Sequence, residues 1–139
     1  MFLLDTNVLS ELRQRRNRKP DPNVVAWARR VAPEDLFLSA ICILELEMGV
    51  LQKQRTDPTQ GAVLRSWLEE HVLTSFAGRI LPVDIAVAQR CAALHVPDPR
   101  SYRDSLIAAT ALIHGMTVVT RNVLHFTRTG VKILNPWQA

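Results

Sequence analysis

The sequence predicts an α/β fold with a mostly parallel central sheet of about four to five strands and helices on both of its faces. Short apolar segments of strand character alternate along the chain with longer segments whose apolar residues recur at helical spacing. The chain also shows no composition shift, repeat or low-complexity segment, and its length suits one hydrophobic core. We therefore expect residues 1–139 to form a single domain.

The first half of the chain begins with an apolar run, residues 2–4, which has the character of a short buried strand and ends at Asp5. A helical pattern starts at once and continues to about residue 16. Further on, Asp21 followed by Pro22 is a typical helix start, because Asp caps free N–H groups and proline suits the first helical position. The other elements expected in this half are a helix over 23–31, a strand over 36–39, a helix from 40 to about 54 and a helix from 59 to about 74.

The second half repeats the alternation of strands and helices. A strand is expected over 80–83, and Asp84 then caps a helix that runs to about residue 95. Residues 102–114 form a segment that is apolar nearly all round, which is typical of a helix buried on most sides. The remaining strands are expected over 117–120 and 132–134.

The composition is that of a globular protein, with 47% hydrophobic and 22% charged residues. No apolar run approaches the roughly 20 residues that a membrane span needs, so we expect no membrane partner. Asp5 and Glu11 interrupt the start of the chain, so we expect no signal peptide and a cytoplasmic location. Cys42 and Cys91 each lie inside an apolar helical pattern, which indicates buried free thiols.

Positive charge is concentrated in one short run. The net charge is +4 and the sequence pI about 9.7, which favours a polyanionic partner. A solvated helix end would explain the run, since positive charge suits the negative end of a helix dipole. A phosphate-binding patch or a contact for an acidic protein would explain it as well. The basic residues of the run are Arg13, Arg15, Arg16, Arg18 and Lys19.

Asp5 is the first candidate site residue, because ligands of open α/β sheets bind at the carboxyl ends of the strands. Asp5 or Thr6 could instead serve only as a helix cap. Glu45 is the second candidate, because it falls on a helix face that is expected to be buried. The apolar residues of this face are Ile41, Leu44, Met48 and Leu51. A glutamate on a buried face must be paired or bound to a cation, so an ion pair with an arginine is the alternative.

Asp104 is the third candidate, because helix starts lie at the same edge of the sheet as the carboxyl ends of strands. Ser101 and Asp104 also fit a capping box, which would give Asp104 a structural role alone. The strand over 117–120 ends in polar residues like the first strand does, so Thr120 and Asn122 could reach the same cleft. A turn is the alternative at Asn122.

Carboxylates gathered at one point need a cation, or their mutual repulsion raises their pKa values. Oxygen ligands suit a hard ion such as Mg²⁺ or Mn²⁺, and such an ion in a basic protein indicates phosphate chemistry. The sequence has no glycine-rich phosphate loop, and its four histidines lack metal-ligand spacing. An aspartyl-phosphate enzyme of the haloacid dehalogenase type would need a second acid two residues after Asp5, where this chain has Asn7.

Four sequence segments resemble motifs of PIN-domain ribonucleases, and their order and spacing are most similar to the VapC toxins of bacterial toxin–antitoxin pairs. The resemblance extends from residue 2 to about residue 137. The segments are Asp5-Thr-Asn-Val-Leu-Ser-Glu11, Ser39-x-x-x-x-x-Glu45-Leu-x-x-Gly49, Arg103-Asp-Ser-Leu-Ile-Ala-Ala-Thr-Ala111 and Val118-Val-Thr-Arg-Asn-Val-Leu-His-Phe126.

The resemblance implies a PIN-like three-layer fold and a Mg²⁺- or Mn²⁺-dependent endoribonuclease that cleaves RNA with an activated water. Asp5, Glu45 and Asp104 then match the metal-binding and catalytic carboxylates of the family. By the same matching, Thr6 and Thr120 are supporting polar groups.

The chain departs from the family pattern at two positions. Asn122 stands where a fourth acid is common, and His125 stands where an aspartate is frequent. The first departure makes a second metal ion uncertain, because an amide supplies no charge. We interpret His125 as a structural histidine or one at the cleft rim, and not as a general base.

The resemblance also implies a cognate antitoxin protein that blocks the cleft, and a homodimer or a toxin–antitoxin hetero-oligomer. The basic run from Arg13 to Lys19 would then contact RNA or the antitoxin. The alternative is a catalytically weak or inactive PIN domain that acts as an RNA-binding or interaction module. The intact set of Asp5, Glu45 and Asp104 favours the enzyme.

Overall fold

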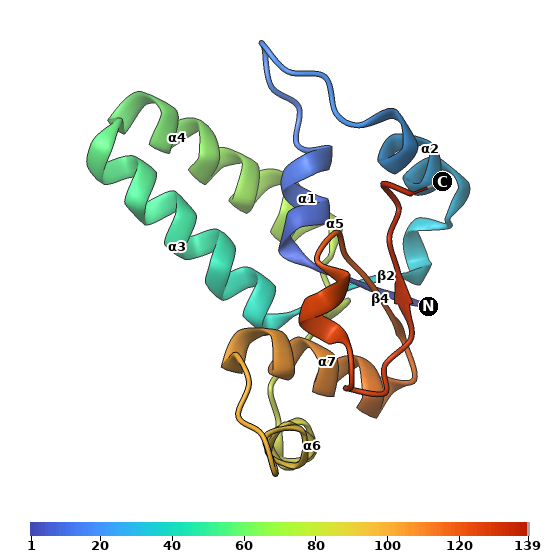
Figure 1. Cartoon of the computed structure of the whole chain (residues 1–139). Coiled ribbons are helices and arrows are strands. Elements are labelled where there is room, and N and C mark those ends of the chain that lie inside the picture. The colour runs from blue at the N-terminus through green and yellow to red at the C-terminus, as the bar shows by residue number, and fades with distance from the viewer. Residues whose placement is uncertain (139) are drawn as a thin grey trace.

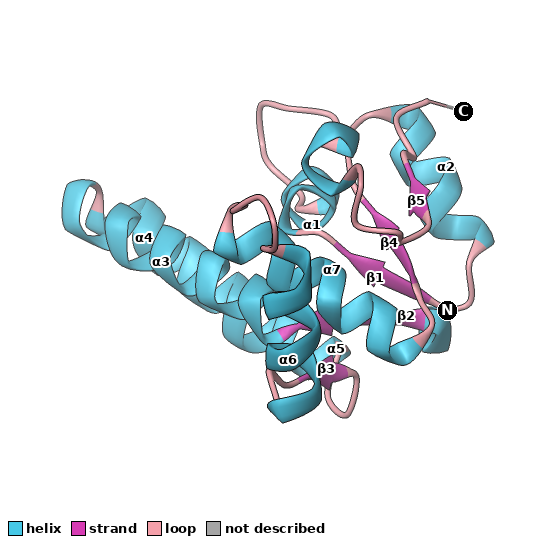
Figure 2. Ribbon diagram, turned by 60° about the horizontal axis from the view of Figure 1, so that its bottom comes forward, coloured by secondary structure: helices cyan, strands magenta, loops and turns pink. Residues whose placement is uncertain are grey.

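The computed structural model describes residues 1–138 and contains a five-stranded parallel sheet with helices on both faces (Figures 1 and 2). The strand order is β3-β2-β1-β4-β5, and every neighbouring pair is parallel. The α/β prediction is therefore confirmed. The strands are β1 (Phe2–Leu4), β2 (Leu36–Ser39), β3 (Ile80–Leu81), β4 (Thr117–Val119) and β5 (Ile133–Leu134).

The helices follow the strands in the predicted alternation. Among them, α3 and α4 form an antiparallel pair that extends away from the sheet (Figure 1). The helical elements are α1 (Thr6–Leu12), α2 (Pro22–Arg30), η1 (Pro33–Asp35), α3 (Ala40–Thr56), α4 (Pro58–Ser66), η2 (Trp67–Val72), α5 (Leu73–Ser75), α6 (Ile85–Leu94), α7 (Tyr102–His114) and η3 (Val123–Phe126). Within residues 1–138, no helix combines the length and the apolar character that crossing a membrane requires.

Adjacent residues of the central strands belong to opposite faces of the sheet. Leu3 and Val118 pack into a cluster with α7, whereas Leu4 and Val119 pack into a larger cluster with α1, α2, α3 and the helical segment after α4. All four side chains are at most 1% exposed. Burial on both faces explains why the strands are continuous apolar runs without polar alternation.

Several predicted boundaries need correction. The strand expected over 80–83 ends at Leu81, because Pro82 has no N–H group to donate to a neighbouring strand. The helix expected from 59 to about 74 contains a π-helical stretch, η2, between α4 and α5. Cys42 and Cys91 are buried and free, as predicted.

The first helix is also shorter than predicted, since it ends at Leu12 and not near residue 16. Arg13 adopts an extended backbone with ψ of 125°. The Glu11 carboxylate then accepts hydrogen bonds from Arg18 and from the backbone N–H of Asp21, which draws the following loop back across the end of the helix. The basic run therefore lies on a loop and not on a helix end.

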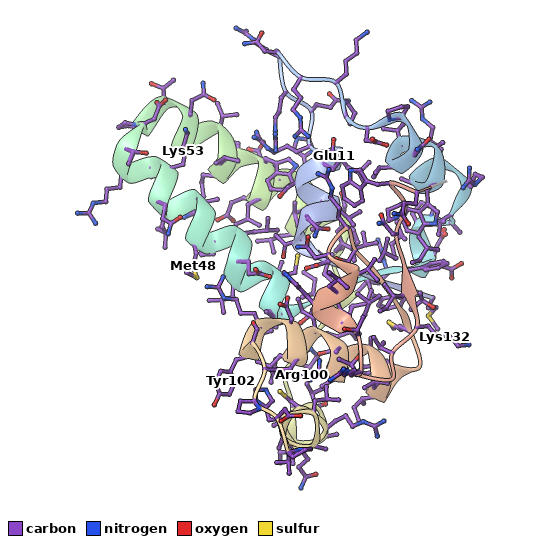
Figure 3. The ribbon with its side chains drawn as sticks, in the orientation of Figure 1. Glu11, Met48, Lys53, Arg100, Tyr102 and Lys132 are labelled. Atoms are coloured by element: carbon purple, nitrogen blue, oxygen red, sulfur yellow. The ribbon has the colours of Figure 1, made fainter. Side chains whose placement is uncertain are left out.

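The apolar face predicted for α3 is wrong in part. Leu44, Met48 and Leu51 were expected to be buried, but their exposed fractions are 47%, 37% and 55% (Met48 is labelled in Figure 3). The helix instead buries a second stripe, formed by Ile41, Cys42, Leu46 and Val50. Two apolar stripes run along this helix, and the position of α4 beside it decides which one faces the core.

Replacing Gly61 with alanine is expected to lower the free energy of unfolding by about 1–3 kcal/mol, the usual cost of overpacking. A Cβ atom on Gly61 would lie 2.4 Å from the Cα of Gln54, because α3 and α4 touch through their backbones at this point. Urea unfolding followed by circular dichroism measures the change.

Gly49→Ala is the matched control, since its Cβ meets no atom within 4 Å. This change should raise the free energy of unfolding by up to about 1 kcal/mol through helix propensity. Equal effects of the two substitutions would contradict the close contact between the helices.

Candidate active site

A cleft of about 640 Å³ opens at the carboxyl edge of the sheet, beside the ends of β1 and β4. Asp5, Thr6, Glu45, Asp104 and Asn122 all contribute to it, so the structure brings these predicted site residues together. The complete lining is Asp5, Thr6, Asn7, Ser10, Glu11, Arg18, Glu45, Ser101, Arg103, Asp104, Arg121, Asn122, His125 and Trp137.

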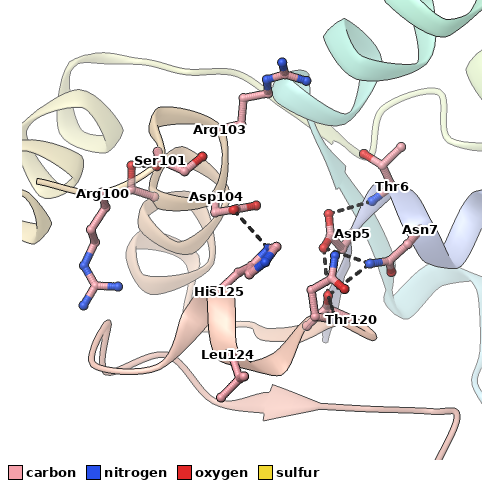
Figure 4. A network of polar contacts seen from close by, with 12 residues as sticks. Asp5, Thr6, Asn7, Arg100, Ser101, Arg103, Asp104, Thr120, Leu124 and His125 are labelled. Carbon is pink, nitrogen blue, oxygen red and sulfur yellow. Dashed lines mark hydrogen bonds and ion pairs between the residues drawn. The ribbon is translucent and has the colours of Figure 1, made fainter.

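Asp5 is both a helix cap and a residue of the cleft. It directly follows β1, is only 6% exposed, and caps α1 through a 2.8 Å hydrogen bond from the Thr6 N–H to Oδ1. Its Oδ2 accepts a 2.7 Å bond from the Thr120 hydroxyl and a longer one, 3.4 Å, from Asn7 Nδ2 (Figure 4). Burial raises the pKa of Asp5, and the bonds from Thr120 and Thr6 oppose the rise.

Thr120 does not line the cleft, because it is fully buried. The Thr120 hydroxyl donates its only hydrogen to Asp5. Its oxygen accepts a hydrogen bond of 3.0 Å from the Asn122 N–H. This bond holds the chain just after β4, so that the exposed Asn122 side chain reaches the cleft. Thr120 therefore contacts Asp5 from the protein interior and lies behind the cleft.

Glu45 projects from the second turn of α3 and is 25% exposed. Its Oε1 accepts a 2.9 Å hydrogen bond from the Thr6 hydroxyl, and Oε2 lies 3.6 Å from Arg103 Nη1. Burial raises the pKa of Glu45, and the negative charges of Asp5 and Asp104 raise it further, against the effects of Thr6 and Arg103. The ion pair considered as an alternative role is thus present inside the cleft.

Asp104 lies in the first turn of α7 and is 26% exposed. The capping box expected from the sequence does not form, because the Ser101 side chain makes no capping hydrogen bond. The Asp104 carboxylate instead lies 3.3 Å from Nδ1 of His125, which comes from η3 (Figure 4). His125 therefore lies at the rim of the cleft in direct contact with one of the predicted carboxylates.

The basic run divides between two surfaces. Arg18 lines the cleft with the carboxylates. Arg13, Arg15, Arg16 and again Arg18 line a second groove of about 800 Å³ against the first turn of α4. Lys19 is exposed on the same loop.

Glu11 is a cleft residue to which the sequence assigned no role. It is 6% exposed, and its Oε1 and Oε2 each accept a hydrogen bond of 2.9 Å, from Arg18 and from the Asp21 N–H. The one sequence feature that could have indicated it is its position one helical turn after Asn7, which places it on the face of α1 toward the cleft. Arg103, Arg121 and Trp137 were likewise not predicted as cleft residues.

The donor chemistry of the cleft fits a hard divalent ion. Asp5, Glu45 and Asp104 supply carboxylate oxygens, and Asp5 and Glu45 have raised pKa values, partly because of the other negative charges. Among residues 1–138, however, no three acidic, histidine or cysteine side chains are placed so that they could hold one ion. Glu45 and Asp104 point toward Arg103 and His125, so holding an ion requires these side chains to turn.

The sequence matches the PIN domain over residues 2–131. The chain belongs to the PIN-domain family. The VapC ribonuclease Y4jK of Sinorhizobium fredii is 38% identical to this PIN domain and the toxin FitB of Neisseria gonorrhoeae is 41% identical. Each match covers 99% of this chain and 99% of the relative.

Solved structures give the same family relation. The crystal structure of FitAcB from Neisseria gonorrhoeae contains a chain with a TM-score of 0.89 and 40% sequence identity to this PIN domain, covering 100% of both chains. A chain in the structure of FitAB bound to an IR36 DNA fragment has a TM-score of 0.88 and 39% identity, and the match covers 100% of this chain and 97% of that one.

Lowering the pH is expected to stabilise the native PIN domain relative to its Asp5→Asn variant when divalent ions are absent. The folded-state pKa of Asp5 lies above the ordinary value of 3.8, so the folded state binds the proton more tightly than the unfolded state. The stabilisation therefore grows as the pH falls through the raised pKa, and it is complete below the unfolded-state pKa. Urea unfolding in EDTA between about pH 7 and pH 4 measures the difference between the two proteins, which should change by about 1.4 kcal/mol per unit of pKa shift. A difference that stays constant or shrinks toward low pH would show that Asp5 is not strained by burial.

Proposed function

We propose that this PIN domain is a Mg²⁺- or Mn²⁺-dependent endoribonuclease that cleaves RNA phosphodiester bonds with an activated water. The observation that carries the proposal is the convergence of Asp5, Glu45 and Asp104, from three separate elements, on one cleft. The similarity to the VapC ribonuclease Y4jK supports the reaction class.

The carboxylates of Asp5, Glu45 and Asp104 are the groups that would hold the metal. A bound divalent ion lowers the pKa of its water and neutralises charge on the phosphate. The protein's own contribution is positioning: Thr120 holds Asp5, and the Thr6 hydroxyl holds Glu45. These bonds keep two mutually repelling carboxylates on adjacent walls of the cleft.

The distribution of arginines supports a polyanionic substrate. Arg18, Arg103 and Arg121 stand among the acids of the cleft. The second groove, lined by Arg13, Arg15 and Arg16, continues from Arg18 along the same loop. A run of guanidinium groups leading away from the carboxylates suits the backbone of an RNA strand, and the same surface would serve an antitoxin segment.

We further propose that the chain is the toxin of a toxin–antitoxin pair and forms a homodimer. Its similarity to the toxin FitB supports the first part. The exposed stripe of Leu44, Met48 and Leu51 on α3 supports the second, because apolar residues one helical turn apart form a continuous surface that a second copy would cover.

An RNA-binding PIN domain without catalytic activity is the second candidate. It is favoured by Asn122, which brings no charge to the cleft, and by the existing contacts of Glu45 and Asp104 with Arg103 and His125. A cleavage assay separates the two candidates.

Asp5→Asn and Asp104→Asn are each expected to reduce cleavage of RNA by at least about 100-fold, because each removes a carboxylate of the proposed metal site. The measurement is the rate of cleavage of total cellular RNA by the purified variants in Mg²⁺, with mapping of the new 5′ ends. EDTA should abolish the activity of the native protein, and added Mg²⁺ or Mn²⁺ should restore it.

Glu34→Gln is the control for these variants, since this exposed acid precedes β2 at the opposite edge of the sheet. It should cleave at the native rate. Undiminished cleavage by Asp5→Asn, or full activity in EDTA, would rule out the proposed mechanism. Cleavage absent from the native protein and from Glu34→Gln alike would favour the inactive RNA-binding domain.

Met48→Glu is expected to convert the dimer into a monomer, because it places a charge within the apolar stripe of α3. Light scattering coupled to gel filtration measures the mass in solution. Ile113→Glu, a charge at an exposed apolar position at the end of α7, should leave the mass unchanged. If both variants remain dimeric, the interface lies elsewhere.

A further inference from the structure

The lining of the cleft also includes cationic and aromatic groups that do not contact Asp5, Glu45 or Asp104. Arg18, Arg121 and Trp137 line the cleft beside the carboxylates but take no part in holding Asp5, Glu45 or Asp104. They come from three segments far apart in the sequence: the loop after α1, the residue after Thr120, and the segment that follows β5. Their meeting in one place is therefore a feature of the fold.

Glu11 fixes the position of Arg18. The buried carboxylate accepts a bond from Arg18 Nη2 at 2.9 Å, while the guanidinium is half exposed to the cleft. Both carboxylate oxygens of Glu11 are hydrogen-bonded, since the Asp21 N–H donates to the second one. Arg18 thus has a fixed base and an open side, with further N–H donors that could bind a phosphate oxygen.

Trp137 is fixed in a similar way. Its backbone N–H donates to Asn135 Oδ1 at 3.0 Å, and its backbone carbonyl accepts from Asn23 Nδ2 at 2.9 Å. The guanidinium carbon of Arg121 lies 5.5 Å from the centre of the indole ring. Together Arg121 and Trp137 form a cation–aromatic pair in the wall of the cleft, with the indole partly exposed.

Both fixed groups are attached to the start of α2. The Asp21 N–H holds Glu11, which holds Arg18, and Asn23, two residues later, holds Trp137. The start of α2 therefore links the Arg18 side chain to the backbone of Trp137.

We propose that Arg18, Arg121 and Trp137 form a subsite that binds one nucleotide of single-stranded RNA next to the carboxylates, an assignment that rests on the proposed function for the identity of the ligand. The base stacks on the Arg121–Trp137 pair, and Arg18 binds its phosphate. Planar bases stack on aromatic rings and guanidinium planes, and this requires bases that are not stacked in a duplex. An acidic protein segment would use the arginines but would have no need of the indole.

Tryptophan fluorescence tests the stacking directly. The chain has three tryptophans; Trp27 is buried in the core, and Trp67 lies beneath Arg13 in a separate groove. A short single-stranded RNA should quench the tryptophan fluorescence of the native protein. The titration is done in EDTA and low salt so that no cleavage occurs. The quench should be lost in Trp137→Phe and kept in Trp67→Phe.

Affinity gives a second readout. Trp137→Ala should weaken RNA binding by about 5- to 150-fold, the range for loss of one stacked base, and Trp137→Phe should weaken it less. Arg18→Gln should reduce the salt dependence of binding by about 0.7 in the slope of log affinity against log salt, as expected for one lost phosphate contact. Arg90→Gln, an exposed arginine on α6 that lines neither groove, should leave the slope unchanged.

The outcomes separate this subsite from the nuclease proposal. The subsite is supported if RNA quenches the fluorescence of Trp137 and if Arg18→Gln lowers the slope of log affinity against log salt. This holds even when the protein cleaves no RNA in Mg²⁺. Two results would overturn the subsite and leave the nuclease proposal intact, provided that the native protein cleaves RNA. One is that RNA still quenches the fluorescence of Trp137→Phe as it does in the native protein. The other is that Trp137→Ala cleaves RNA with an unchanged KM. A native protein that binds no RNA, or an Arg18→Gln slope equal to that of Arg90→Gln, overturns the subsite too.

Discussion

The hydrogen bond from the Thr120 hydroxyl to the Asp5 carboxylate is the interaction on which the cleft depends. It is buried, 2.7 Å long, and joins the ends of the two central strands. A carboxylate that is only 6% exposed is costly unless donors surround it, and Asp5 has them in Thr120, the Thr6 N–H and Asn7. Since Thr120 also receives the Asn122 N–H, one hydroxyl group sets both the central acid and the polar loop after β4.

The same arrangement explains the electrostatic character of the site. Thr6 contributes its N–H to Asp5 and its hydroxyl to Glu45, so one residue spaces two carboxylates that repel each other. Burial and these charges also raise the pKa of the neighbouring Cys42 thiol to about 12, which leaves it without a nucleophilic role at neutral pH. On the outer side of the carboxylates, Arg103 contacts Glu45 and His125 contacts Asp104. The cleft therefore combines carboxylates with the guanidinium groups of Arg18, Arg103 and Arg121.

The strands and most helices could be predicted, because apolar runs, caps and terminal glycines act locally. The positions of Asp5 and Thr120 followed from the same local patterns, since both come directly after a buried strand. Glu45 was placed correctly by partly wrong reasoning: α3 has two apolar stripes, and only the packing of α4 decides which one is buried. The role of Glu11 could not be predicted, because it depends on the loop after α1. This loop folds back so that Arg18 contacts Glu11 on α1. Contacts of this kind form only in the folded tertiary structure and produce no periodic pattern in the sequence.

The central position of β1 has a consequence for how the protein is made. β1 lies between β2 and β4, and the partners Asp5 and Thr120 are 115 residues apart. During synthesis, the first strand can pair with β2 early, but its other edge stays open until β4 has left the ribosome. A chain that has not yet reached Thr120 therefore carries Asp5 without the hydroxyl group that holds it. The arrangement of Asp5 seen in the folded cleft is therefore completed only when the segment after β4 has been synthesised.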